Sequence, residues 1–115
     1  MNVRNKGARG ERELAGVLAG IVGSARRTGQ SQSQTDAPEA DVEWLEGLLV
    51  EAKRCERVEI DKWCDKNERQ ARLLNVISLV GWRKNRGEWR VALPLKDLHA
   101  LSKLIVEALD EQNKD

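Results

Sequence analysis

The stretch DVEWLEGLLVEAKR, residues 41–54, decides the fold. It alternates apolar and charged residues around a glycine, as two short antiparallel strands do when a tight turn joins them. A three-residue loop, residues 45–47, with Gly47 in the left-handed conformation, pairs Val42 with Val50 across the strands. A loop shorter by one residue would mix apolar and charged side chains on both faces, so the three-residue loop is the predicted register.

In this register one face of the hairpin is apolar and the other carries charge, because successive side chains of a strand point to opposite faces. The apolar face consists of Val42, Trp44, Leu48, Val50 and Ala52. The other face consists of Asp41, Glu43, Leu49, Glu51 and Lys53. The first face predicts the side of a sheet that packs on a core, and the second is the candidate functional face.

Asp41, Glu51 and Lys53 are predicted to lie side by side, since Glu51 and Lys53 are two apart on one strand and Asp41 faces Glu51. Two facing carboxylates destabilise a sheet, and a bridging cation removes that penalty. Hard divalent ions such as Mg²⁺ or Mn²⁺ favour carboxylate and carbonyl oxygens, and the Ala52 backbone carbonyl is a further candidate ligand. In the alternative interpretation, Lys53 simply pairs with both acids on a solvated sheet face.

An amphipathic helix is predicted over residues 6–22, with apolar side chains at the i, i+3, i+4 and i+7 positions of one stripe. These are Leu14, Val17, Leu18, Ile21 and Val22. Glu11 falls on the same stripe at about 100° per residue, whereas Glu13 is predicted to point well away. An inward carboxylate needs a metal or another partner, because burying an uncompensated charge is costly. In the alternative, Glu11 complements the helix dipole or meets an arginine.

The rest of the chain completes an α/β pattern. We expect a short strand in 24–29, a mobile loop at 29–40, a helix over 59–74, strands at 75–82 and 88–94 around a turn at 83–87, a closing helix from Leu98 to Leu109, and a polar tail at 111–115. The order αβββαββα predicts an α/β fold in one domain, residues 1–115, with a central mixed five-stranded sheet flanked by helices.

The four tryptophans are the only aromatic residues of the chain. Trp44 and Trp63 fall on apolar faces, which predicts core positions for both. Trp82 and Trp89 flank the basic turn at 83–87, where they are candidates to line DNA or a subunit interface, with an ordinary packing role as the alternative.

Charge is unevenly distributed although the net charge is only +1. Residues 30–51 carry six acids and no Lys or Arg, whereas residues 1–29 and 52–90 are both basic. An acidic island between basic blocks suits carboxylates that hold metal ions beside cations that hold a nucleic acid backbone. The two cysteines fit neither a zinc site nor a disulfide framework, which indicates reduced thiols. No signal peptide or membrane span is expected, and the predicted location is the cytoplasm of a microbial or phage-infected cell.

Asp41, Glu51 and Lys53 stand at the spacing D-x9-E-A-K, which resembles the signature of the PD-(D/E)xK nuclease superfamily. The opening NKGARGERELAGVL, residues 5–18, is similar to the start of archaeal-type Holliday-junction resolvases, which have a basic KG followed by a catalytic glutamate, an arginine, a glutamate and a leucine. Glu11 matches that glutamate, and Arg12 the arginine after it. Two features depart from the pattern: Ala40 replaces the nominal proline, and the segment 29–40 is longer than the family suggests.

The resemblance implies a restriction-endonuclease-like fold and a dimeric, Mg²⁺- or Mn²⁺-dependent endonuclease that cuts branched DNA such as four-way junctions symmetrically. Asp41, Glu51 and the Ala52 carbonyl would hold a first metal, Glu11 would position a second metal or the water, and Lys53 would orient the nucleophile and stabilise charge on the phosphate. Gln70 is a candidate support for this site. The DNA-contacting residues would be Lys6, Arg9, Arg12, Arg26, Arg27, Gln30, Ser31 and Arg54.

Two other functions remain open at this point. One is a less structure-selective repair or phage nuclease of the same superfamily, acting on flaps, ends or plain duplex. The other is a non-catalytic DNA-binding module. The intact set Glu11, Asp41, Glu51 and Lys53 argues against the module, because a protein that only binds DNA has no need of facing carboxylates that repel phosphate.

Overall fold

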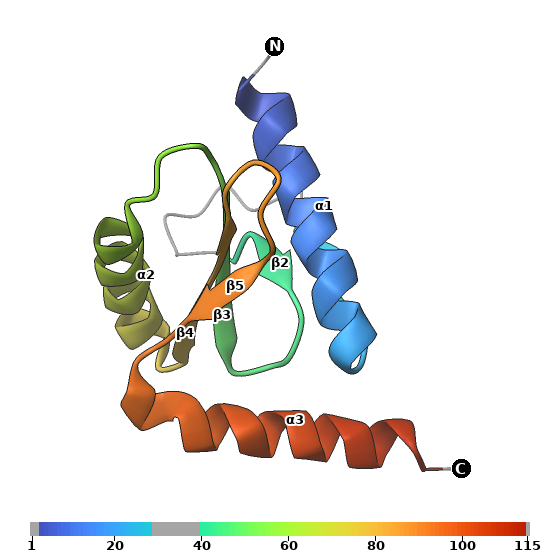
Figure 1. The fold of residues 1–115 in the computed structure, drawn as a ribbon. Helices are drawn as coiled ribbons and strands as arrows, with labels where there is room; N and C mark the ends of the chain where they lie inside the picture. Colours follow the sequence, from blue (N-terminus) through green and yellow to red (C-terminus); the bar gives the residue numbers. More distant parts are fainter. Residues whose placement is uncertain (1–2, 29–39, 115) are drawn as a thin grey trace.

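The computed structural model describes residues 3–28 and 40–114. A sheet lies between helices α1 and α2, and helix α3 crosses one end of this arrangement (Figure 1). The elements are α1 (Val3–Ile21), β1 (Arg26–Arg27), β2 (Val42–Glu43), β3 (Leu48–Arg54), α2 (Ile60–Leu74), β4 (Ile77–Arg83), β5 (Arg90–Ala92), the 3-10 turn η1 (Leu95–Asp97) and α3 (Leu98–Gln112). No helix within the described residues is long and apolar enough to cross a membrane.

The five strands form one mixed sheet in the order β1-β2-β3-β4-β5. Strands β3 and β4 are parallel, because α2 carries the chain from the end of one back to the start of the other, and the remaining neighbours are antiparallel. The predicted order αβββαββα and the mixed five-stranded sheet are confirmed.

The hairpin of β2 and β3 has the predicted register. Val42 pairs with Val50, and both are almost completely buried. Gly47 has φ of 99°, a conformation that side chains with a Cβ disfavour, so a glycine ends this turn. The register places the apolar face of the hairpin on the core and leaves Glu51 and Lys53 on the opposite face.

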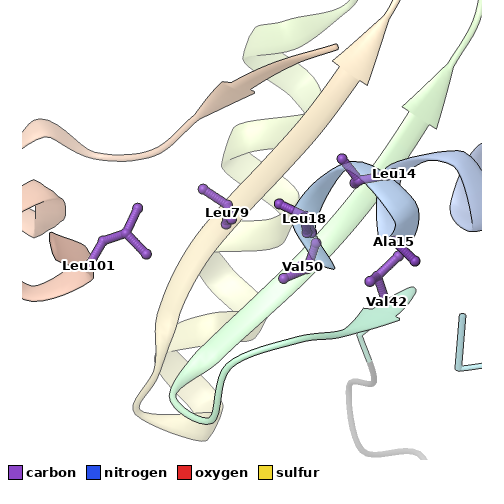
Figure 2. Close-up of a cluster of buried hydrophobic side chains, with 7 residues drawn as sticks. All are labelled: Leu14, Ala15, Leu18, Val42, Val50, Leu79 and Leu101. Carbon is purple, nitrogen blue, oxygen red and sulfur yellow. The ribbon is translucent and has the colours of Figure 1, made fainter. Parts of the chain in front are cut away.

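The core lies between the sheet and the inner stripe of α1 (Figure 2). Its buried members are Leu14, Ala15, Leu18, Val42, Val50, Leu79 and Leu101. Leu14 rests directly on β4, because a Cβ built on Gly81 would come within 2.5 Å of a Leu14 methyl carbon. Val17 and Ile21, which the sequence placed on the same stripe, are about half exposed, so the buried stripe is narrower than predicted.

Helix α2 covers the other face of the sheet through a buried polar residue. Asn67 is 2% exposed. Its amide nitrogen donates to the Leu49 carbonyl oxygen at 3.0 Å and to Ser78 Oγ at 2.8 Å. These bonds tie α2 to β3 and β4 together, which fixes the helix on the face that carries Glu51 and Lys53.

The predicted boundaries differ from the structure at both terminal helices. Helix α1 begins at Val3 rather than near Lys6. Helix α3 continues to Gln112, so the first two residues of the predicted polar tail are helical. The Gln112 side chain supports this last turn by accepting a 2.7 Å hydrogen bond from the Gly23 amide. The predicted mobile loop lies outside the described residues, except for Ala40.

Candidate active site

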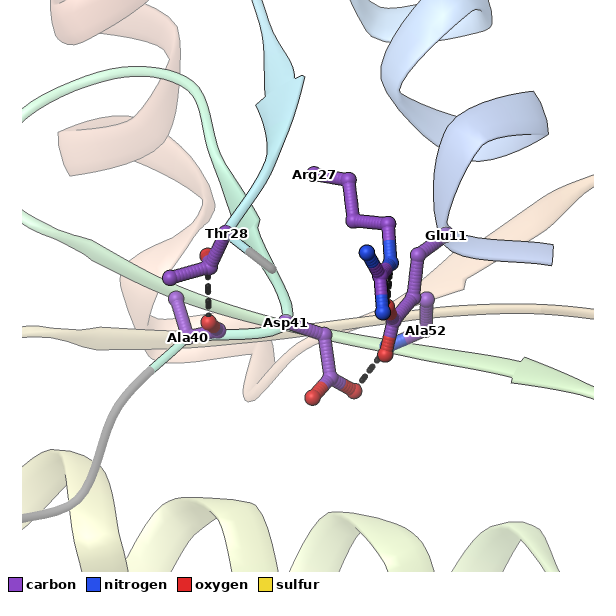
Figure 3. A network of polar contacts seen from close by, with 6 residues as sticks. All are labelled: Glu11, Arg27, Thr28, Ala40, Asp41 and Ala52. Atoms are coloured by element: carbon purple, nitrogen blue, oxygen red, sulfur yellow. Dashed lines mark hydrogen bonds and ion pairs between the residues drawn. The ribbon is translucent and has the colours of Figure 1, made fainter. Parts of the chain in front are cut away.

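Asp41 stands immediately before β2, alongside the middle of β3. Its backbone amide donates to the Val50 carbonyl oxygen at 2.9 Å. Its carboxylate Oδ2 accepts a hydrogen bond from the Ala52 amide at 3.0 Å (Figure 3). The backbone and the side chain of Asp41 are therefore both held by β3, in the stretch that contains Glu51.

Glu51 and Lys53 lie beside each other on β3, as the period of a strand requires. Lys53 Nζ is 3.3 Å from Glu51 Oε1. The Glu51 side chain is mostly buried, whereas the Lys53 side chain is 36% exposed. The ammonium group thus lies next to the carboxylate and is accessible to a ligand from solvent.

Glu11 reaches this region from α1, as the helical stripe predicted. Figure 3 shows the Glu11 and Asp41 side chains pointing toward the same place beside Ala52. Glu11 Oε1 accepts a 2.7 Å hydrogen bond from Arg27 Nε of β1, and both side chains are about one-fifth exposed. Glu11 therefore meets an arginine, as one of the alternatives for this residue stated.

Three carboxylates act on one another at this point. Burial, the Glu51 charge and the Glu11 charge together raise the pKa of Asp41 from 3.8 to about 7, although the hydrogen bond from the Ala52 amide opposes the shift. The Asp41 carboxylate consequently gains or loses its proton near neutral pH. A bound cation would relieve the same repulsion.

The donor set fits a hard divalent ion in part. Asp41 and Glu51 supply carboxylates, and the Ala52 carbonyl points to the same side of β3 as the Ala52 amide that Asp41 accepts from. Among the described residues, no group of three or more His, Cys, Asp or Glu side chains is arranged as a metal cage. Mg²⁺ is commonly held by only one or two carboxylates plus waters and substrate phosphate, so two carboxylates and a carbonyl are enough protein ligands for it.

The predicted DNA-contacting residues fall into three groups. Arg9 and Arg12 are exposed on α1. Arg26, Arg27 and Arg54 each pair with a glutamate. The side chain of Lys6, and Gln30 and Ser31 altogether, lie outside the described residues. Gln70 is half-buried on α2, and its support of the metal site stays a prediction, as do the DNA contacts.

Glu13 does not point away from the protein, and the prediction for this residue is wrong. It pairs with Arg54 at 2.8 Å and with Arg83 at 3.4 Å, at the carboxyl ends of β3 and β4. The reason is Gly10, one turn earlier: a Cβ there would lie 3.1 Å from Arg54 Cβ, so α1 approaches β3 closely enough for the two arginines to reach Glu13. Two cations share one carboxylate, and the Nε atoms of both arginines are buried without a hydrogen-bond partner among the described residues.

Thr28 is a further residue that the sequence did not single out. Its backbone amide donates to the Asp41 carbonyl oxygen at 3.0 Å, and its hydroxyl donates to the Ala40 carbonyl oxygen at 2.6 Å. Thr28 therefore holds the chain immediately before Asp41. A threonine between two arginines and a glycine carried no periodicity signal that could have indicated this role.

The structure resembles that of Hjc from Archaeoglobus fulgidus, a Holliday junction resolvase from an archaeal hyperthermophile. The two chains share 21% sequence identity over 76% of each, with a TM-score of 0.54. This likeness supports the predicted restriction-endonuclease-like fold. No curated protein matches the sequence.

The family model described as "Phage putative PDDEXK endonuclease" matches residues 2–113. The match spans nearly the whole chain, including Glu11 and the hairpin that carries Asp41, Glu51 and Lys53. The chain belongs to this family of PD-(D/E)xK nucleases.

Proposed function

We propose that the protein is a metal-dependent, structure-selective DNA endonuclease that resolves Holliday junctions or related branched DNA by phosphodiester hydrolysis. The observation that carries this proposal is the position of Asp41 against Ala52, beside Glu51 and next to Lys53. A carboxylate whose pKa is raised by burial and by neighbouring carboxylates, with a partly exposed ammonium group nearby, is suited to a site for a cation and a phosphate together.

Each residue of the site has a role in this proposal. Asp41, Glu51 and the Ala52 carbonyl would hold Mg²⁺ or Mn²⁺, and Glu11 would orient the attacking water or a second ion. The ion supplies charge neutralisation at the phosphate and a more acidic bound water. Lys53, held at 3.3 Å by Glu51, orients the nucleophile and offers its charge to the phosphate oxygens.

The DNA backbone would lie along the exposed cations of α1. Arg9 and Arg12 are on the same helix as Glu11 and are not buried in the fold. Phosphate contacts of this kind position a nucleic acid without reading its sequence. They suit an enzyme that recognises the shape of a branch.

A homodimer is part of the proposal. Two sites related by a two-fold axis cut opposed strands of a four-way junction, which one site does not do in a single encounter. The likeness to a Holliday junction resolvase supports the four-way junction as a substrate. The phage family supports action in the cytoplasm of an infected cell.

A second candidate is a phage nuclease that acts on flaps, ends or plain duplex with little selectivity for junctions. The description of the matching family, which names an endonuclease and no branched substrate, favours this candidate.

The test is cleavage of an end-labelled immobile four-way junction, beside the matching linear duplex and a flap, each with Mg²⁺ and with EDTA. Paired symmetric nicks confined to the junction and abolished by EDTA are the expected result. Comparable cutting of all three substrates establishes the general nuclease instead. Tight binding with no cutting in Mg²⁺ or Mn²⁺ overturns both.

A further inference from the structure

A row of side chains leads from the candidate active site across the sheet. Lys53 of β3 pairs in register with Trp82 of β4, and Trp82 pairs with Arg90 of β5. Register partners on neighbouring strands point to the same face of a sheet. Trp82 is therefore the neighbour of Lys53 on the face that carries Glu51, and Arg90 lies one strand farther out.

Trp82 and Arg90 share a hollow at this edge. The Arg90 guanidinium carbon is 5.9 Å from the centroid of the Trp82 ring. A hollow of about 200 Å³ is lined by Trp82, Lys84, Gly87, Glu88 and Arg90. The indole ring and the guanidinium plane are both groups on which nucleic acid bases stack.

Trp82 does not belong to the core cluster of the described residues against which Trp44 and Trp89 pack. Trp44 and Trp89 pack against the buried cluster around Leu14 and Leu79, and Trp82 is absent from that packing within the described residues. A large half-buried indole outside the core, next to a hollow, is typical of a binding surface rather than of packing.

The turn that follows Trp82 carries a positive charge and is firmly held. The Gly87 amide donates to the Lys84 carbonyl oxygen at 2.9 Å, and Asn85 donates to Glu56 at 3.0 Å. Arg86 has φ of 64°, a left-handed conformation that costs a non-glycine residue energy. Such strain at a residue with an exposed cationic side chain is consistent with a functional constraint.

We propose that Trp82, Arg90 and Lys84 form a subsite that holds an unpaired nucleotide of the DNA strand beside the point of cleavage. This inference rests on the proposed nuclease function. The base stacks on the indole in the hollow, and Lys84 and Arg86 contact the adjoining phosphates. Glu88, the one acid among the residues that line the hollow, faces the amino groups of the base as an acceptor. The subsite favours DNA with unpaired nucleotides at a branch over continuous duplex.

The test is binding in EDTA, measured by fluorescence anisotropy on a duplex with a single-stranded tail and on the matching blunt duplex. Trp82→Leu is expected to weaken binding of the tailed duplex about tenfold, with the blunt duplex changed less than about twofold. Trp82→Phe keeps an aromatic face and restores most of the lost affinity. Arg90→Gln and Lys84→Gln weaken the tailed duplex, and Lys103→Gln, at an exposed position of α3, is the matched charge control.

A single-stranded tail of abasic nucleotides keeps the phosphates and lacks the bases, so it distinguishes contacts to the base from contacts to the phosphates. The native protein is expected to lose about tenfold in affinity when the tail is abasic, whereas Trp82→Leu loses nothing further. This comparison on the native protein stands even where a variant fails to fold. Equal loss on tailed and blunt DNA, or an abasic penalty that survives Trp82→Leu, overturns the subsite.

The measurement is independent of cleavage. Base-dependent binding through Trp82, together with undiminished cleavage by Glu51→Gln, contradicts the proposed active site and leaves the subsite standing. Binding that depends neither on the base nor on Trp82, together with loss of cleavage in Glu51→Gln, contradicts the subsite alone.

Discussion

The carboxylate of Asp41 accepts a hydrogen bond from the backbone amide of Ala52 at 3.0 Å, beside Glu51. Together with the 2.9 Å hydrogen bond from the Asp41 amide to the Val50 carbonyl oxygen, this bond holds the Asp41 carboxylate against the middle of β3.

Burial of Asp41, together with the neighbouring charges of Glu51 and Glu11, makes the stability of the metal-free protein fall as pH rises. The pKa of Asp41 is raised from 3.8 to about 7, so between these values the folded state keeps a proton that the unfolded state has released. The resulting stabilisation is complete below about pH 4 and is lost as pH rises through 7. Asp41→Asn should be more stable than the native protein at pH 8, by on the order of a few kcal/mol, with the difference shrinking toward pH 5. Urea unfolding in EDTA measures this, with Glu46→Gln in the exposed turn as control, and an equal effect at both pH values would contradict it.

Mg²⁺ should stabilise the native protein more at pH 8 than at pH 6, because the ion competes with the proton on Asp41. A saturating ion at about 100 times its Kd adds about 2.7 kcal/mol. The melting temperature with increasing Mg²⁺ checks this. Glu51→Gln should remove most of the increase, and an unchanged increase in that variant would place the ion elsewhere.

Glu51→Gln should abolish cleavage while folding and DNA binding remain. Loss of outer partners of a metal site already costs 10- to 100-fold, so loss of a ligand should cost at least about 100-fold. The assay is cleavage of the labelled junction in Mg²⁺, with circular dichroism to establish folding. Glu43→Gln, which removes an exposed carboxylate paired with Arg26, is the control and should cut normally. Cleavage by Glu51→Gln at the native rate sinks the proposed site.

Glu13→Gln should destabilise the protein by about 1–3 kcal/mol, because it leaves Arg54 and Arg83 without their shared carboxylate. Thermal unfolding measures the loss, and Glu107→Gln on the exposed side of α3 is expected to change little. Replacing Arg83 by Leu in the Glu13→Gln background should cost less than in the native protein. Strict additivity of the two substitutions would show that they are not coupled.

Gly81→Ala should cost about 1–3 kcal/mol, since its methyl group would enter the space of Leu14. Gly16→Ala is the matched control on α1, where a methyl group meets nothing within 4 Å and improves the helix by about 1 kcal/mol. The two substitutions should therefore move the urea midpoint in opposite directions. Equal effects would mean that α1 does not rest on β4 as described.

The hairpin could be predicted because only one register separates its apolar and charged residues, and Val42 opposite Val50 follows from that condition alone. Glu11 could be predicted because it shares the stripe of Leu14 and Leu18, which the sheet buries. Both inferences depend on the strict repeat of side-chain direction, which is two residues in a strand and about 3.6 residues in a helix.

The partners of Glu13 and Thr28 could not be predicted, because they depend on how closely two elements approach. A helical wheel gives a direction and no distance, so it cannot show that Gly10 brings α1 within reach of Arg54. Nor does any local pattern bring Thr28 to Ala40, twelve residues later in the chain. For the same reason the helical period could not show that Val17 lies outside the buried stripe of α1, because contact with the sheet sets the width of that stripe.

Thr28 bonds both Ala40 and Asp41, so the residues on either side of the segment 29–39 lie next to each other. Closing a longer connection costs only about 0.6 kcal/mol for each doubling of its length. A lineage is therefore free to lengthen, shorten or exchange this segment while the Asp41 side chain keeps its place against β3.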